Sequence, residues 1–178
     1  MPAYRAPHKD EQGGTDPARR LRMCQLALAG EEGLGACGLE IERGGTSYTV
    51  DTLEAVHAKH PGARLTLIVG ADTAATLDGW REPARLLELA ELAVAARAGA
   101  GRGRVLDAVA RAAGVLAPGA VAPVRFLEMP EIDASSSAVR ERVARGEAIE
   151  PLVGPAVAAY IEEHRLYRPR GGVPSDAG

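Results

Sequence analysis

The chain has 178 residues, of which 46% are hydrophobic and 25% are charged, a composition typical of a single globular domain with its own core. A net charge of −3 and an aromatic content of only 3% argue against nucleic acid as a partner, because they provide neither a basic surface nor a set of stacking rings. The sequence shows no signal peptide and no apolar run long enough to cross a bilayer, so we expect a cytoplasmic protein without a membrane partner.

The first half of the chain predicts four elements. Asp16-Pro17 is a typical helix start, and the apolar stripe that follows it extends to Gly30. Residues 39–42 alternate apolar and acidic side chains, which predicts a short strand. A helix is expected over residues 48–60, and the continuous apolar run at 65–69 is typical of a buried parallel strand.

The second half continues this alternation of helices and strands. Helices are expected at residues 80–89, 105–113, 135–146 and 155–167, and strands at 92–96 and 124–129. Alternating elements with short connections predict an α/β fold, a doubly wound, Rossmann-like parallel sheet flanked by helices. We therefore expect one domain over residues 1–168, followed by a disordered tail at 169–178.

Two segments near the N-terminus carry groups that suit anions. His8 and Lys9 follow a proline and could contact phosphate, although a solvated polar loop is the favoured interpretation from spacing alone. A glycine turn precedes the hydroxyls of residues 46–49 at a predicted helix start, where free N–H groups suit a carboxylate or phosphate. An ordinary N-cap made by Ser47 or Thr49 explains that segment equally well.

Three further segments stand where ligands are commonly bound. Asp72 follows a strand, where it could accept hydrogen bonds from ribose, or cap the next helix. Trp80 could stack on a flat ring, although a packing anchor is favoured for a single tryptophan. Ser135, Ser136 and Arg140 at a helix start could cradle a polyphosphate, or form an N-cap beside an exposed arginine.

Metal-ligand spacing is absent from the sequence. His57 and His60 lie three residues apart on one predicted helix, but they have no cluster of carboxylates as partners. We expect both to be surface residues near the end of the helix, and no metal site is predicted.

Taken together and in order, these segments resemble bacterial nicotinate mononucleotide adenylyltransferase. Single motifs are weakly specific, whereas their order and spacing along nearly the whole chain are specific. The matching stretches are PHK at 7–9, RRLRMCQLALAG at 19–30, SYTVDTL at 47–53, LIVGADTAATLDGWREPARLL at 67–87, SSSAVRERVARG at 135–146 and VAAYIEEHRLYR at 157–168.

The resemblance implies a Rossmann-like nucleotidyltransferase that transfers adenylate from ATP to nicotinate mononucleotide, giving deamido-NAD and pyrophosphate in NAD synthesis. Mg²⁺ would be the cofactor, and homo-oligomerisation stays open. Tyr48 and Thr49 would surround the nicotinate, with backbone amides on its carboxylate, and Trp80 would lie against the pyridine ring. His8 and Lys9 would approach phosphate.

On the ATP side the resemblance implies six residues, with Gly70 and Asp72 at ribose, Arg97 at the border of the site, and Ser135, Ser136 and Arg140 at the triphosphate. The nucleophile is the phosphate of the mononucleotide, so the chemistry needs alignment and charge neutralisation and no protein nucleophile.

The family's GxFxPxHxGH segment, whose two histidines face the reacting phosphates, does not occur in this sequence. No catalytic residue is therefore assigned, and the first two strands of the family's sheet are expected to be missing. We expect Met1 to be a misassigned start at an internal GTG codon and the natural protein to be longer. If the chain begins at Met1, we expect poor solubility and negligible adenylyl transfer. The alternative function is a nucleotide-binding or regulatory protein that keeps the pockets without turnover.

Overall fold

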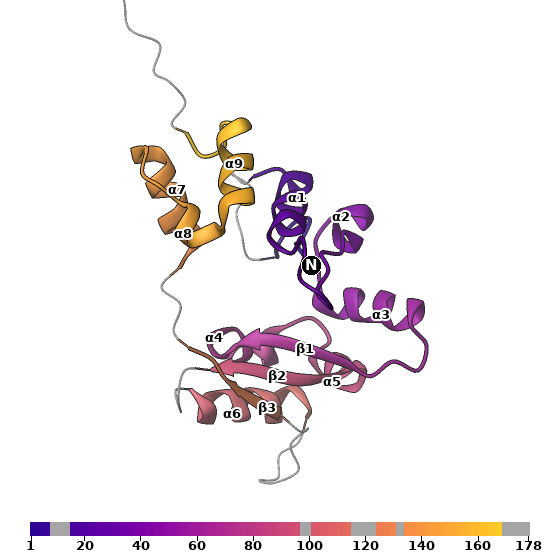
Figure 1. Ribbon diagram of the computed structural model, residues 1–178. Helices are drawn as coiled ribbons and strands as arrows, with labels where there is room; N and C mark the ends of the chain where they lie inside the picture. The colour runs from indigo at the N-terminus through magenta and orange to yellow at the C-terminus, as the bar shows by residue number, and fades with distance from the viewer. Residues whose placement is uncertain (8–14, 97–100, 115–123, 131–133, 169–178) are drawn as a thin grey trace, which may run out of the picture. The chain divides into compact units, whose positions relative to one another are not determined.

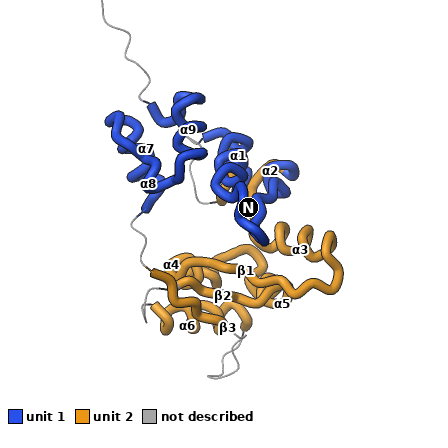
Figure 2. Tube along the Cα trace, viewed as in Figure 1, with its two compact units in different colours: residues 1–4, 10–43, 132–178 blue, residues 5–9, 44–131 orange. Residues whose placement is uncertain are grey.

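The computed structural model describes residues 1–7, 15–96, 101–114, 124–130 and 134–168 (Figure 1). Contacts divide the chain into two compact units (Figure 2). Unit 1 comprises residues 1–4, 10–43 and 132–178, and unit 2 comprises residues 5–9 and 44–131. Unit 1 is helical among its described residues, whereas unit 2 holds a sheet, and the single domain expected over 1–168 stays a prediction.

Unit 2 contains a parallel sheet of three strands in the order β1-β2-β3, with β1 at Leu65–Gly70, β2 at Ala90–Ala96 and β3 at Val124–Glu128. Leu67 is paired with Leu92, and Leu92 with Val124. All three predicted strands of this unit are confirmed, with ends that differ by one or two residues. Parallel pairing follows from the helical connections between consecutive strands.

One face of the sheet builds the core of unit 2. Helices α3 (Thr49–Lys59), α4 (Ala71–Ala74), α5 (Pro83–Leu89) and α6 (Arg102–Ala112) and the 3₁₀ turn η1 (Leu77–Gly79) contribute to that unit. The buried core consists of Leu53, Ala74, Leu77, Leu86, Ala90, Leu92, Val94, Val105, Val109 and Ala112. Leu65, Leu67 and Val69 of β1 pack against it.

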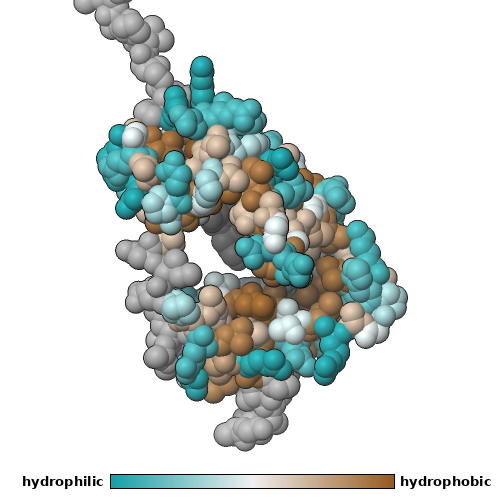
Figure 3. Space-filling view, in the orientation of Figure 1, coloured by the Kyte–Doolittle hydropathy of each residue, from teal (hydrophilic) through white to brown (hydrophobic). Residues whose placement is uncertain are grey.

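The alternate side chains of β1 point away from this core. Thr66 is exposed, and 63% of the Ile68 surface is accessible. The expectation of a strand buried on both faces is therefore wrong for β1. Successive side chains of a strand point to opposite faces, and the helices cover only the face that holds Leu65, Leu67 and Val69. Figure 3 shows apolar surface over the part of unit 2 that holds the strands.

The described helices of unit 1 are α1 (Pro17–Ala27), α2 (Leu39–Arg43), α7 (Ser136–Arg145), α8 (Glu150–Val153) and α9 (Pro155–Glu163). All of them except α2 contribute side chains to a second core or to the layer packed against it. Val139, Ile149, Val157, Ala158, Ile161 and Leu166 form this core. The predicted start of α1 is confirmed, because the Asp16 carboxylate accepts hydrogen bonds from the backbone N–H groups of Ala18 at 2.9 Å and Arg19 at 3.1 Å.

The strand predicted at residues 39–42 is wrong, because this segment forms α2. Alternation creates a strand only where a neighbouring strand accepts its backbone hydrogen bonds, and no described strand forms a ladder with residues 39–43. A helix satisfies its own backbone, as shown by the Glu42 N–H, which donates to the Gly38 carbonyl at 2.9 Å. Leucine, glutamate and arginine also favour helix. In the described part of the chain, no helix is long and apolar enough to span a membrane.

Candidate functional site

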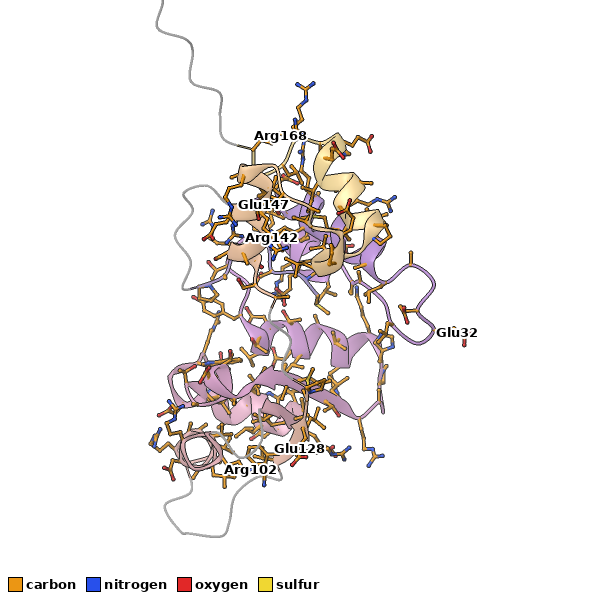
Figure 4. All side chains as sticks on the ribbon, turned by 60° about the vertical axis from the view of Figure 1, so that its left-hand side comes forward. Glu32, Arg102, Glu128, Arg142, Glu147 and Arg168 are labelled. Carbon is orange, nitrogen blue, oxygen red and sulfur yellow. The ribbon has the colours of Figure 1, made fainter. Side chains whose placement is uncertain are left out.

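The carboxyl ends of the three strands define one edge of unit 2. Gly70 ends β1 opposite Ala95, and Glu128 ends β3 opposite Ala96. Helix α6 begins at Arg102, whose guanidinium lies 4.8 Å from the centroid of the Phe126 ring, and Figure 4 shows Arg102 and Glu128 at this end of unit 2. Ligands of open α/β sheets bind outside this edge, so its polar side chains form the first candidate group.

Asp72 stands at this edge directly after β1. It lies in the first turn of α4, whose N-cap position is held by Gly70, so Asp72 does not cap the helix. Its side chain is 98% exposed, and one carboxylate oxygen lies 3.7 Å from a guanidinium nitrogen of Arg104 on α6. Asp72 therefore presents acceptor oxygens to solvent beside a cation, which suits the hydroxyls of a nucleotide ribose.

Tyr48 and Thr49 stand at the start of α3. This helix leads into β1 through a short turn and runs back along it (Figure 1), so its N-terminal end lies toward the carboxyl edge of the sheet. Tyr48 occupies the N-cap position, and its side chain makes no capping hydrogen bond. The first-turn N–H groups of a helix lack intrahelical partners and attract anions, so this start suits a carboxylate.

Trp80 follows the 3₁₀ turn η1 and is partly buried against the core of unit 2. Its backbone N–H donates to the Leu77 carbonyl at 3.0 Å, and its indole N–H donates to the Thr76 hydroxyl at 3.2 Å. The packing interpretation of this tryptophan is confirmed. Because the residue is only partly buried, packing and stacking on a ligand are compatible.

Arg81, which the sequence does not single out, brings the Tyr48 and Trp80 segments together. Its guanidinium lies 4.8 Å from the centroid of the Tyr48 ring, and one of its terminal nitrogens lies 3.6 Å from the Asp51 carboxylate. Its Nε lies 3.5 Å from the carboxylate of Glu82. No spacing rule predicts a contact between residues 48 and 81, because it depends on how α3 packs beside α5.

An ion pair braces the turn that precedes Trp80. The Arg111 Nε of α6 donates to the Asp78 carboxylate of η1 at 2.6 Å. This hydrogen bond holds the pKa of Asp78 below its ordinary value and raises the pKa of Arg111. Both side chains reach solvent, so the pair orients η1 more than it stabilises the fold.

The serine-rich candidate group lies in unit 1, at the start of α7. The Ser135 hydroxyl accepts a hydrogen bond from the Ala138 N–H at 3.1 Å, which confirms that Ser135 is an N-cap. Ser136 is the first helical residue and is exposed. Arg140 is exposed one turn later and donates to the Ser137 hydroxyl at 3.3 Å. This group thus combines a helix start, hydroxyls and a guanidinium on one short segment.

His8, Lys9 and Arg97 lie outside the described residues. Within the described part of the chain, no three His, Cys, Asp or Glu side chains cluster as metal ligands would. His57 and His60 are exposed at the end of α3, as the sequence predicts.

Comparison with known proteins relates the chain to one family of enzymes. Residues 1–142 match the family described as cytidylyltransferase-like. The chain is 38% identical over 168 residues to a probable nicotinate-nucleotide adenylyltransferase of Synechococcus sp. (strain JA-2-3B'a(2-13)), a match that covers 94% of this chain and 80% of that protein. It is 37% identical over 179 residues to a protein of the same description from Gemmatimonas aurantiaca, covering 99% of this chain and 81% of that one.

Solved structures show the same fold. Plasmodium falciparum nicotinic acid mononucleotide adenylyltransferase complexed with NaAD superimposes with a TM-score of 0.62 at 16% identity, covering 89% of this chain and 78% of that one. The same enzyme complexed with APC gives a TM-score of 0.60 over 86% of this chain and 76% of the other. The α/β nucleotidyltransferase fold expected from the sequence is confirmed.

Proposed function

Because the chain belongs to the nicotinate-nucleotide adenylyltransferase family, we propose that it transfers the adenylyl group of ATP to nicotinate mononucleotide. The reaction is adenylyl transfer in NAD biosynthesis, and its products are deamido-NAD and pyrophosphate. The similarity to relatives of this description along 94% of the chain carries the proposal.

The transfer is a displacement at the α-phosphorus of ATP. A phosphate oxygen of the mononucleotide forms a new bond to the α-phosphorus. The bond between the α-phosphorus and the oxygen that bridges it to the β-phosphorus breaks. Pyrophosphate leaves with the electron pair. Because the attacking group is already an anion, the protein has to align two phosphates and offset their charge.

The pyridine end of the mononucleotide would bind at the start of α3. The first-turn N–H groups around Thr49 suit its carboxylate, and the rings of Tyr48 and Trp80 suit a flat pyridine. The exposed Asp72 beside Gly70, at the end of β1, suits a ribose hydroxyl.

The triphosphate of ATP would bind Ser135, Ser136 and Arg140. Their helix start supplies N–H groups and hydroxyls, and the guanidinium supplies charge. His8, Lys9 and Arg97 are proposed as further phosphate contacts on the family resemblance.

Mg²⁺ would enter as the complex with ATP. Mg²⁺ at nucleotide sites is held largely by phosphates and water with one or two carboxylates. When bound, the ion would neutralise charge on the phosphates. The chain's own hydroxyls and guanidinium would then orient the same oxygens.

The proposal is tested by measuring pyrophosphate release by the purified protein, including any residues that the reading frame encodes before Met1, with ATP and nicotinate mononucleotide, nicotinamide mononucleotide or no acceptor. We expect release only with an acceptor, and faster release with the nicotinate form. Thermal stabilisation by ATP or the mononucleotide without release would favour the alternative, a nucleotide-binding protein without turnover.

A further inference from the structure

Arg81 joins two segments of unit 2 that are far apart in the sequence. One segment is the start of α3, with Tyr48 and Asp51, and the other is the turn from Trp80 to Glu82 that leads into α5. Its guanidinium lies 4.8 Å from the centroid of the Tyr48 ring and 3.6 Å from the Asp51 carboxylate. This single side chain therefore contacts both the ring and the acid that α3 presents one turn apart.

The chemistry of the guanidinium suits such a junction. Its flat face is attracted to the ring of Tyr48, while its edge carries N–H donors directed at carboxylates. About half of the Arg81 side chain is exposed, at 49%, so the net stability gained from each contact is small. The combination matters for orientation, because a charge alone would fix neither the plane of the tyrosine ring nor the direction of the turn.

The backbone of the same turn is unusually constrained. Glu82 has a φ of 48°, in the left-handed region that a side-chain-bearing residue rarely adopts, and Pro83 follows it at the first position of α5. On the other side, Trp80 is tied to η1 by the hydrogen bonds to Leu77 and Thr76. Arg81 is thus the residue through which this constrained turn is attached to α3.

We propose that Arg81 is a positioning residue for the pyridine end of nicotinate mononucleotide. It holds Tyr48 of α3 and the turn that begins at Trp80 at a fixed separation, so that the two aromatic side chains need not rearrange when a flat ring binds. This inference rests on the proposed function, which supplies the mononucleotide as the ligand. Arg81 itself contacts Tyr48 and Asp51 and takes no part in the displacement at phosphorus.

A positioning role predicts a selective loss of affinity. Replacing Arg81 by methionine keeps most of the side-chain length and removes both the charge and the planar head. We expect the KM for nicotinate mononucleotide to rise about threefold to tenfold, the sum of a weak ring contact and a weak ion pair. The KM for ATP and kcat should stay within about twofold, because the contacts of Arg81 among the described residues are with Tyr48, Asp51 and Glu82, and none of these is proposed to bind ATP.

Arg85 of α5, the helix that follows this turn, provides a matched control. It also links α5 to α3, with Nε donating to Glu54 at 3.2 Å and a terminal nitrogen donating to Glu88 at 2.9 Å, and it is 46% exposed. Among the described residues, its side-chain partners are Glu54 and Glu88, and neither Tyr48 nor the 80–82 turn is one of them. Arg85→Met should therefore change thermal stability about as much as Arg81→Met and leave the KM for nicotinate mononucleotide unchanged.

The experiment measures KM for both substrates, kcat and Tm for the full chain and its R81M, R81K and R85M variants. R81K keeps a cation near Asp51 without the planar fork, so it should restore part of the affinity. Equal KM values in R81M and the unaltered chain, or equal increases in R81M and R85M, would overturn the positioning role. An unaltered protein that shows no adenylyl transfer, even with any residues encoded before Met1, would instead overturn the proposed function.

A second measurement works without turnover. Trp80 is the only tryptophan of the chain, so intrinsic tryptophan fluorescence reports this turn alone. In R81M we expect acrylamide to quench the ligand-free protein more strongly than in R85M. Identical quenching in the two variants would show that Arg81 does not hold the turn.

Discussion

The two compact units hold their candidate ligand residues in different ways. In unit 2, Tyr48 is linked to the turn after Trp80 by Arg81, a contact between residues more than thirty positions apart. In unit 1, the side-chain hydrogen bonds of Ser135 and Arg140 among the described residues join residues three positions apart at the start of α7. The residues proposed for the pyridine ring therefore depend on packing between elements of unit 2, whereas those proposed for the triphosphate depend on the start of one helix of unit 1.

This difference predicts that substitutions in the core beneath Trp80 lower the free energy of unfolding more than the other substitutions proposed for the two units. Leu77 of η1 is completely buried, and Leu77→Ala should cost about 3 kcal/mol, from lost burial and the cavity left behind. Urea unfolding followed by Trp80 fluorescence measures the loss. Leu106→Ala on α6, where the side chain is 39% exposed, is the control and should cost under about 1 kcal/mol. Equal losses of unfolding free energy in the two variants would show that the burial of Leu77 does not anchor η1.

At the phosphate end, stability and ligand binding can be separated at Ser135. Ser135→Ala removes the cap of α7 and should cost about 1 kcal/mol of unfolding free energy, measured by chemical denaturation. Ser135→Asp keeps a capping oxygen and should preserve stability, but its negative charge should raise the KM for ATP. An unchanged KM in the aspartate variant would remove Ser135 from the proposed ATP contacts.

These contrasts explain what the sequence could predict. Local signals were sufficient for the N-caps at Asp16 and Ser135 and for the three strands, because helix starts and apolar runs are encoded within a few residues. The segment at 39–43 was predicted wrongly, because alternation does not say whether a partner strand is present. Arg81 was missed, since its role exists only once α3 and the turn before α5 are packed together.

The smallest predicted effect concerns the ion pair that braces η1. The native state lowers the pKa of Asp78, so the stability due to its ionised form is present at neutral pH and is lost as pH falls through the lowered pKa. The loss should appear below the ordinary aspartate range, about pH 3.9. Thermal unfolding of the unaltered chain and of Asp78→Asn across this range checks it. The variant should lose less stability on acidification than the unaltered chain. Parallel plots of Tm against pH for the two proteins would show that the Asp78–Arg111 pair does not contribute to stability.

The most direct test of this account is a crystal structure of the protein with deamido-NAD bound. The account predicts that the nicotinate ring lies against Tyr48 and Trp80, with its carboxylate at the start of α3 and Arg81 still beside Tyr48 and Asp51. A nicotinate ring bound away from both aromatic side chains would contradict the assignment of the pyridine end to unit 2.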